Sequence, residues 1–309
     1  MKSRILTSAA IFCAATFLLV SCQKSNSDDK DYSAESTTHS DDQNRFSVEM
    51  DAAANDVNGV LETTTGFAGR GGDIQSICDA TIVVDTMSNP RTITITFNGT
   101  NCLGNRTRTG VIVVSMAQGV RWKNAGAQLN VTFQNFKITR LADNKSITVN
   151  GTETYTNVSG GLLINLASLN TITHTINSSN MSVTFDNGSQ RNWQVGRQRV
   201  FSYNGGNATI TVTGTHTQGS TSGIAEWGTN RFGNAFTTAI TLPLTFKYDC
   251  SFRLGSGRVE HVTNLFNASV IFGLDANGNP TGCPGANPYY MKIVWTGPAN
   301  IPHTIIWPY

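Results

Sequence analysis

The histidines and cysteines of this chain are the first side chains to consider for metal binding or acid–base chemistry. The histidines are widely separated, and neither an HExxH motif nor a CxxC pair occurs. His174 is in phase with Ile172 and Ile176 at the two-residue period of a strand, so we expect it on a partly buried strand face. The sequence therefore predicts no metal site and no cofactor. The five histidines are His39, His174, His216, His261 and His303.

Acidic side chains are the next candidates, because a glycan hydrolase needs two facing carboxylates. Their spacing brings no two of them together, and roles in turns or on the solvated surface are expected instead. We therefore expect a protein that is not an enzyme. The loosely grouped candidates in the second half of the chain are Asp186, Glu226, Asp249 and Glu260.

The segment "QRNWQVGRQR", residues 190–199, combines an aromatic ring with cationic side chains. Aromatic rings stack on sugar faces, and guanidinium groups bind anionic ligands. This predicts candidate ligand-binding residues; in the alternative interpretation, the tryptophan fills the core and the arginines line a strand edge. The candidates are Arg191, Trp193, Arg197 and Arg199.

Charge is unevenly divided along the chain. Charged residues make up 14% of the whole, against about 25% in an average protein, and Thr, Asn, Ser and Gly are abundant. Acids exceed bases in residues 22–62, whereas from residue 63 on 17 Lys and Arg accompany 10 Asp and Glu. This composition indicates an extracellular β protein. The basic excess of its main domain either serves solubility or favours acidic partners such as anionic glycans or lipid headgroups. It lacks the basic and aromatic interleaving of a nucleic-acid binder.

The N-terminus has the pattern of an export signal. Lys2 and Arg4 precede an apolar run, residues 5–20, that is too short to span a bilayer comfortably. The following "LVSC", Leu19 to Cys22, resembles the lipobox of bacterial lipoproteins. That resemblance implies a signal peptide over residues 1–21, cleavage before Cys22 and acyl chains on the new N-terminal cysteine. Two or three acyl chains would hold the protein stably on a membrane.

Residues 22–45 are rich in Ser, Asp, Thr and Asn and predict a disordered tether that holds the domain about 25 to 30 Å from the bilayer. Within them, "DDKD" resembles the signal that sends Bacteroidota-type lipoproteins to the cell surface. The expected location is thus the outer membrane, facing the cell exterior. Thr86, in "DTM", fits the short O-glycosylation acceptor described for the same bacteria.

Residues 46–309 are predicted to form one β-rich domain. Apolar residues from Phe46 to Leu61 recur at helical spacing and predict one short helix over about 46–61. After about residue 74, segments such as "TITITF" (92–97) and "LNVTFQNFKI" (129–138) alternate apolar and polar residues, with Asn-Gly and Asn-Pro turns between them. We expect an all-β class: antiparallel sheets that form a sandwich or an open half-barrel.

Four cysteines remain once Cys13 leaves with the signal peptide and Cys22 is lipidated, and three pairings are open to them. Cys78 and Cys102 lie symmetrically about Pro90 in the "SNPR" turn, which predicts that they face each other across a hairpin. The remaining pair would be Cys250 with Cys283. Similar hairpins around both pairs suggest two related halves, about 74–165 and 200–309, and we favour a single pseudo-repeated unit.

The lipobox, the acidic helix, "CDATIVVDTMSNPRTITITFNGTNCLGN", "VNGTETYTN" and "PLTFKYDC" together resemble a group of uncharacterised outer-membrane lipoproteins of Bacteroidota. The resemblance implies no activity. We expect a non-enzymatic surface lipoprotein with a binding or structural role toward a glycan or another envelope component. The alternatives are a lipid- or lipoprotein-handling half-barrel, in which residues 46–62 cover an apolar inner face, and a glycan-active hydrolase.

Overall fold

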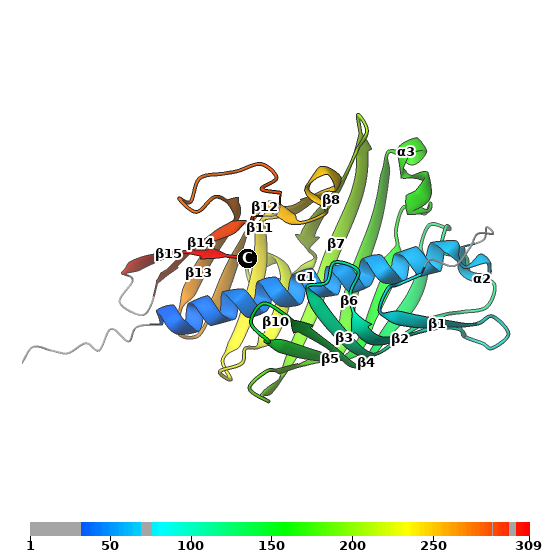
Figure 1. The fold of residues 1–309 in the computed structure, drawn as a ribbon, viewed down its shortest axis with the longest axis horizontal. Coiled ribbons are helices and arrows are strands. Elements are labelled where there is room, and N and C mark those ends of the chain that lie inside the picture. The colour runs from blue at the N-terminus through cyan, green and yellow to red at the C-terminus, as the bar shows by residue number, and fades with distance from the viewer. Residues whose placement is uncertain (1–31, 69–75, 286, 297–300) are drawn as a thin grey trace, which may run out of the picture.

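The computed structural model describes residues 32–68, 76–285, 287–296 and 301–309. Within these ranges, no helix is long and apolar enough to cross a membrane. One long helix lies along the hollow side of a large curved sheet (Figure 1). The helical elements are α1 (Ser33–Thr63), α2 (Thr65–Ala68), η1 (Leu163–Asn165), α3 (Leu166–Leu169) and η2 (Tyr248–Cys250).

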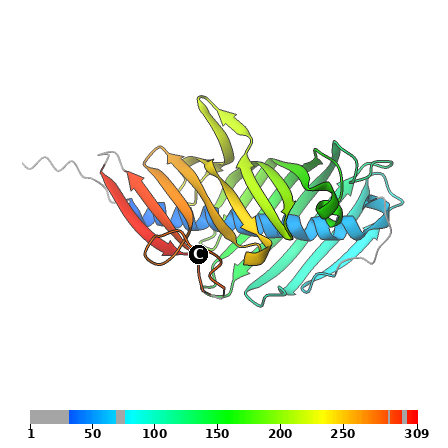
Figure 2. The same ribbon diagram turned by 90° about the horizontal axis from the view of Figure 1, so that it is seen from above.

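All described strands belong to one 15-stranded antiparallel sheet, which confirms the all-β class and replaces the two-sheet sandwich by a single sheet. The sheet twists and curves around α1 (Figure 2). Its strands are β1 (Ala80–Asp85), β2 (Arg91–Thr100), β3 (Arg106–Met116), β4 (Ala127–Arg140), β5 (Ser146–Asn157), β6 (Thr171–Phe185), β7 (Gln190–Asn204), β8 (Asn207–Gly214), β9 (His216–Gln218), β10 (Thr221–Thr229), β11 (Ala235–Lys247), β12 (Leu254–Thr263), β13 (Asn267–Leu274), β14 (Tyr290–Thr296) and β15 (Pro302–Pro308).

Neighbouring strands in the chain are mostly neighbours in the sheet, except at a fork between β7 and β11. There β10 pairs with β7 and β11 toward one end of these strands, and β8 pairs with both toward the other end. After Gly214 the chain stops pairing with β7 and β11, and it pairs with β11 again from Ile224 on. A Cβ on Gly214 would collide with the Gly223 carbonyl group. The β9–β10 hairpin starts from this fork.

The strands form where the sequence alternates. In β2, for example, Ile93, Ile95 and Phe97 are buried on the inner face, and the residues between them are more exposed. The inner faces of β1 to β7 and the second half of α1 form one apolar cluster, and the inner faces of the later strands form another. β6 and β7 contribute to both clusters, so the two cores lie under one continuous sheet.

The helix α1 begins at Ser33 and ends at Thr63, which corrects two expectations. Residues 33–45 are helical and largely buried, and so do not belong to a disordered tether, and the helix is longer than the predicted 46–61. The second half follows the predicted apolar seam, whose members include Phe46, Met50 and Val57. The first half has almost no such seam, and several of its acidic side chains, such as Asp41 and Asp42, are instead paired with arginines of the sheet.

Both disulfides join the cysteines that the sequence pairs. Cys78 is bonded to Cys102 beside the β1–β2 hairpin, in which Ala80 pairs with Phe97. Cys250, at the end of η2, is bonded to Cys283 in the segment between β13 and β14. The two crosslinks therefore lie toward opposite ends of the strand order.

Candidate functional site

A line of ion pairs joins α1 to the inner face of the sheet. The helix supplies carboxylates and the strands, or the turns between them, supply guanidinium groups, so the acidic excess of α1 is matched by part of the basic excess of the domain. Burial raises the pKa of Asp42 to about 6, although its hydrogen bonds to Arg231 oppose this rise. The pairs are Asp41 with Arg140 at 3.1 Å, Asp42 with Arg231 at 2.6 Å, Glu49 with Arg106, Asp51 with Arg197 at 3.8 Å and with Arg199 at 3.6 Å, and Asp56 with Arg108 at 2.6 Å.

Glu226 on β10 is the centre of the most buried part of this line. The Trp193 indole donates a 2.7 Å hydrogen bond to one carboxylate oxygen, and the Arg197 guanidinium and the Ser47 hydroxyl donate to the other. Gln43 adds a further bond from the helix, at 3.1 Å. The four donors satisfy both oxygens of this buried carboxylate, so the cluster holds α1 on the sheet.

The candidate ligand-binding residues of 190–199 all have odd numbers and therefore share the inner face of β7. The prediction for three of them needs correction. Trp193, Arg197 and Arg199 are buried under α1, with at most 2% of each residue's surface exposed. They cannot form a ligand-binding surface, and the alternative interpretation of a core tryptophan holds. Arg191 lies at the rim of the sheet, where its guanidinium donates to the carbonyl oxygens of Asn230 and Arg231.

Buried titratable groups accompany the ion pairs. The His39 ring lies 4.9 Å from the His261 ring and 4.8 Å from the Phe236 ring, measured between centroids. Burial lowers the pKa of His39 to about 3 and also that of His174 to about 3. Burial has the opposite effect on Glu153 and raises its pKa to about 7, despite a hydrogen bond from Tyr155. The buried rings are therefore neutral imidazoles near neutral pH.

Among the described residues, one group of metal-ligand types is close enough to share an ion: Asp249, Cys250 and Cys283. Both sulfur atoms are joined in a disulfide, so they are not thiolate ligands. Two of the acidic residues considered from the sequence contact different partners and not each other. Asp186 pairs with Arg231, and Glu260 accepts a hydrogen bond from Ser269.

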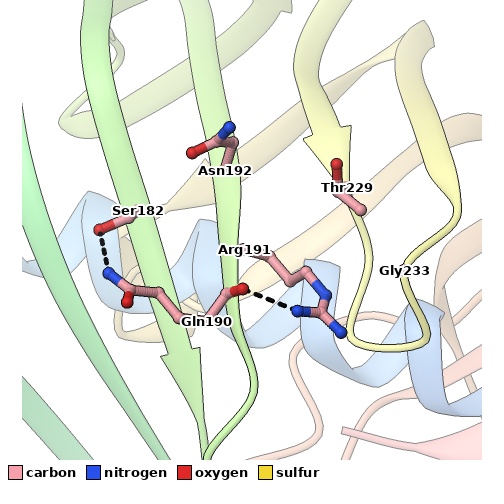
Figure 3. A pocket seen from close by; sticks show the side chains of 6 residues that line it. All are labelled: Ser182, Gln190, Arg191, Asn192, Thr229 and Gly233. Carbon is pink, nitrogen blue, oxygen red and sulfur yellow. Dashed lines mark hydrogen bonds between the residues drawn. The ribbon is translucent and has the colours of Figure 1, made fainter.

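The outer face of the sheet has an open hollow of about 550 Å³ where β6, β7 and β10 meet (Figure 3). Inside it, the Gln190 side-chain amide donates to the Ser182 hydroxyl at 3.3 Å, and the Arg191 guanidinium donates to the Gln190 carbonyl oxygen at 2.8 Å. No carboxylate is among the lining residues, which are Ser182, Gln190, Arg191, Asn192, Thr229 and Gly233.

A second hollow, of about 360 Å³, continues along β10 at the base of the β9–β10 hairpin. Trp227 lines it and is stacked on the His216 ring, with 3.9 Å between centroids and 15° between planes. Trp227 and Thr229 are two residues apart on one strand, so they share its outer face. The two hollows thus form one polar and aromatic strip, which the sequence did not reveal because β7 and β10 are neighbours only through the fork.

Two predicted modification sites lie elsewhere. Thr86 is exposed in the turn between β1 and β2. Cys22 lies outside the described residues, so its lipidation stays a prediction. Comparisons with protein-family models, with curated proteins and with solved structures found no match to this chain.

Proposed function

We propose that this protein is a non-enzymatic lipoprotein of the cell surface that binds a carbohydrate of the cell envelope through the outer strip along β7 and β10. The observation that carries the proposal is the lining of the larger hollow by hydroxyl, amide and guanidinium groups. Acylation of Cys22 would hold the protein on the outer membrane, facing the exterior, as its N-terminal pattern predicts.

Carbohydrate suits this strip because each sugar hydroxyl both donates and accepts hydrogen bonds. The amides of Gln190 and Asn192 offer both donors and acceptors, and Arg191 offers donors alone. The Trp227 ring, which lines the second hollow and is stacked on His216 on one side, supplies an apolar surface of the kind on which a sugar ring stacks. The basic excess of the main domain favours a glycan with anionic groups.

The two alternative functions receive less support. A lipid- or lipoprotein-handling half-barrel has in its favour that the second half of α1 covers an apolar inner face, as that alternative requires. Against it, the helix fills this face and is also joined to it by charged pairs such as Asp42 with Arg231. A glycan hydrolase requires two carboxylates across a cleft, and neither hollow has a carboxylate in its lining.

Binding of the mature chain to envelope polysaccharides, measured by calorimetry after a glycan-array screen, tests the proposal. Removing both amides with Gln190→Ala and Asn192→Ala should weaken binding about tenfold or more, because each lost hydrogen bond costs about 1 kcal/mol. The matched control is Gln128→Ala with Asn130→Ala, an exposed amide pair with the same spacing on β4. Equal affinities for the two double variants, or an array without any bound glycan, would contradict the proposal.

A further inference from the structure

The last strand, β15, is an edge strand that exposes large apolar side chains. The exposed fractions are 52% for Ile301, just before the strand, 36% for Ile306 and 43% for Trp307. Such an edge is a liability in water because it favours association with other apolar surfaces. Its partner in the described sheet is β14, on one side only.

The apolar residues lie on both faces of β15. Trp307 pairs with the buried Met291 of β14, so it continues the inner face of the sheet. Ile306 pairs with Lys292 and belongs to the outer face, where a lysine is its neighbour. A protein that packs against one face of β15 would leave the apolar side chain on the other face in water. An apolar environment on both sides of the strand, such as a lipid interface, would cover both.

The free side of β15 is poorly suited to the addition of another strand. The Tyr309 amide donates to the Tyr289 carbonyl oxygen at 2.9 Å, so odd-numbered residues direct their backbone groups toward β14. Even-numbered residues direct theirs to the free side, and two of these, Pro302 and Pro308, have no N–H group. Thr304 and Ile306 are left as donors, which disfavours pairing with a second copy of this chain.

The edge strand lies close to the start of α1. Both views show β15 beside the first turns of the helix (Figures 1 and 2), and the Tyr32 ring lies 6.2 Å from the Phe266 ring next to β13. About ten residues separate Tyr32 from Cys22. Even fully extended, such a segment reaches about 35 Å at most, so acyl chains on Cys22 would keep this end of the sheet near the bilayer.

We propose that β15, together with Ile301, is a membrane-contact edge that enters the lipid–water interface beside the lipid anchor. Tryptophan is favoured at this depth because its ring is apolar and its N–H group is polar. Lys292 is placed beside Ile306 to meet anionic headgroups. The inference rests on the proposed anchoring at Cys22, and it adds a second contact that fixes which end of the molecule faces the membrane.

The test uses the mature chain with Cys22→Ser, which removes the acyl chains but retains β15. Its partition onto vesicles of phosphatidylethanolamine and phosphatidylglycerol is measured by sedimentation, and quenching of tryptophan fluorescence by brominated lipid reports insertion. We expect measurable binding with quenching. Adding Ile306→Ser and Trp307→Ser should reduce the partition coefficient about tenfold, because two exposed apolar side chains no longer enter the interface.

The control adds Met87→Ser and Leu103→Ser instead, which alter exposed apolar residues, 90% and 82% exposed, near the opposite end of the strand order. Unchanged partition in the β15 variant, or no binding by the Cys22→Ser chain, would overturn the inference. A lipid-free dimer that the β15 substitutions dissociate would overturn it in favour of a second copy. If the double variant does not fold, Ile301→Ser, which lies outside the strand, tests the same contact and should also lower the partition coefficient.

Glycan binding is measured on the same samples. A chain that partitions onto vesicles but binds no glycan would contradict the proposed carbohydrate function and leave the membrane contact standing. A chain that binds glycan but does not partition onto vesicles would contradict the membrane contact and leave the carbohydrate function standing.

Discussion

At the scale of single residues, the interior combines titratable groups whose pKa values move in opposite directions. Burial lowers the pKa of His39 and His174 to about 3, so each becomes charged on unfolding below its ordinary pKa of 6.5. Their contributions to stability are therefore present at neutral pH and are lost as the pH falls from 6.5 toward 3. Glu153 acts in the reverse sense, because its folded-state pKa is raised from 4.5 to about 7.

Glu153→Gln should isolate the pH dependence of stability that the raised pKa of Glu153 causes. Below pH 4.5 the carboxyl is protonated in both states, and the variant should match the parent closely. As the pH rises from 4.5 to 7, unfolding lets the parent carboxyl ionise, so the variant should gain relative stability, on the order of 3 kcal/mol above pH 7. Urea unfolding across this range measures the difference, with Glu260→Gln on the outer face as control. A difference that does not change with pH would contradict the assignment.

At the scale of elements, α1 has two halves with different stabilisation. The second half packs Phe46, Met50 and Val57 into the apolar core. The first half is buried mainly through polar contacts such as Asp42 with Arg231, which lies 189 residues further along the chain. Arginine pairs of this kind stabilise the helix only when the sheet has formed.

Ser40→Pro tests whether residues 33–45 are an ordered helix. Proline removes one helical hydrogen bond and clashes with the preceding turn, so we expect a loss of about 3 kcal/mol or more in the free energy of unfolding. Ser40→Ala is the control at the same position, and it should change little because the buried Ser40 hydroxyl has no hydrogen-bond partner. Denaturant unfolding measures both; equal stabilities would mean that this segment is a tether after all.

At the scale of the whole molecule, the sheet is one continuous structure with two apolar clusters and a disulfide toward each end. The crosslinks close loops with sequence separations of 24 and 33 residues. In the chain-entropy model, each should contribute about 3.5 kcal/mol. The proposed membrane contact at β15 and the outer strip along β7 and β10 belong to the same scale, because each depends on segments that are distant in the chain.

Replacing each disulfide by an alanine pair should show how far the two ends act independently. We expect Cys78→Ala with Cys102→Ala, and Cys250→Ala with Cys283→Ala, each to lower the free energy of unfolding by about 3 to 4 kcal/mol. Since the sites are distant, the losses should add in the quadruple variant to within about 0.5 kcal/mol. Thermal and urea unfolding measure this. A quadruple variant much less stable than the sum would indicate strong coupling through the sheet.

The sequence alone determined what depends on near neighbours in the chain. Period-two alternation predicted strands such as β2 and β4, the hairpin symmetry about Pro90 predicted the bond between Cys78 and Cys102, and the apolar seam predicted the second half of α1. The sequence also shows that Pro302 and Pro308 have no N–H group. It does not show that both lie on the unpaired side of an edge strand.

Tertiary structure decided what depends on distant segments. The first half of α1 lacks an apolar seam, so local patterning predicts a tether, and only arginines from remote strands and turns make it a buried helix. Alternation along β7 separates residues into two faces, but it does not say which face α1 covers; that choice buried Trp193 with Arg197 and left Gln190 with Asn192 in the hollow. The fork that places β10 beside β7 arises from backbone pairing across the chain, which no local pattern encodes.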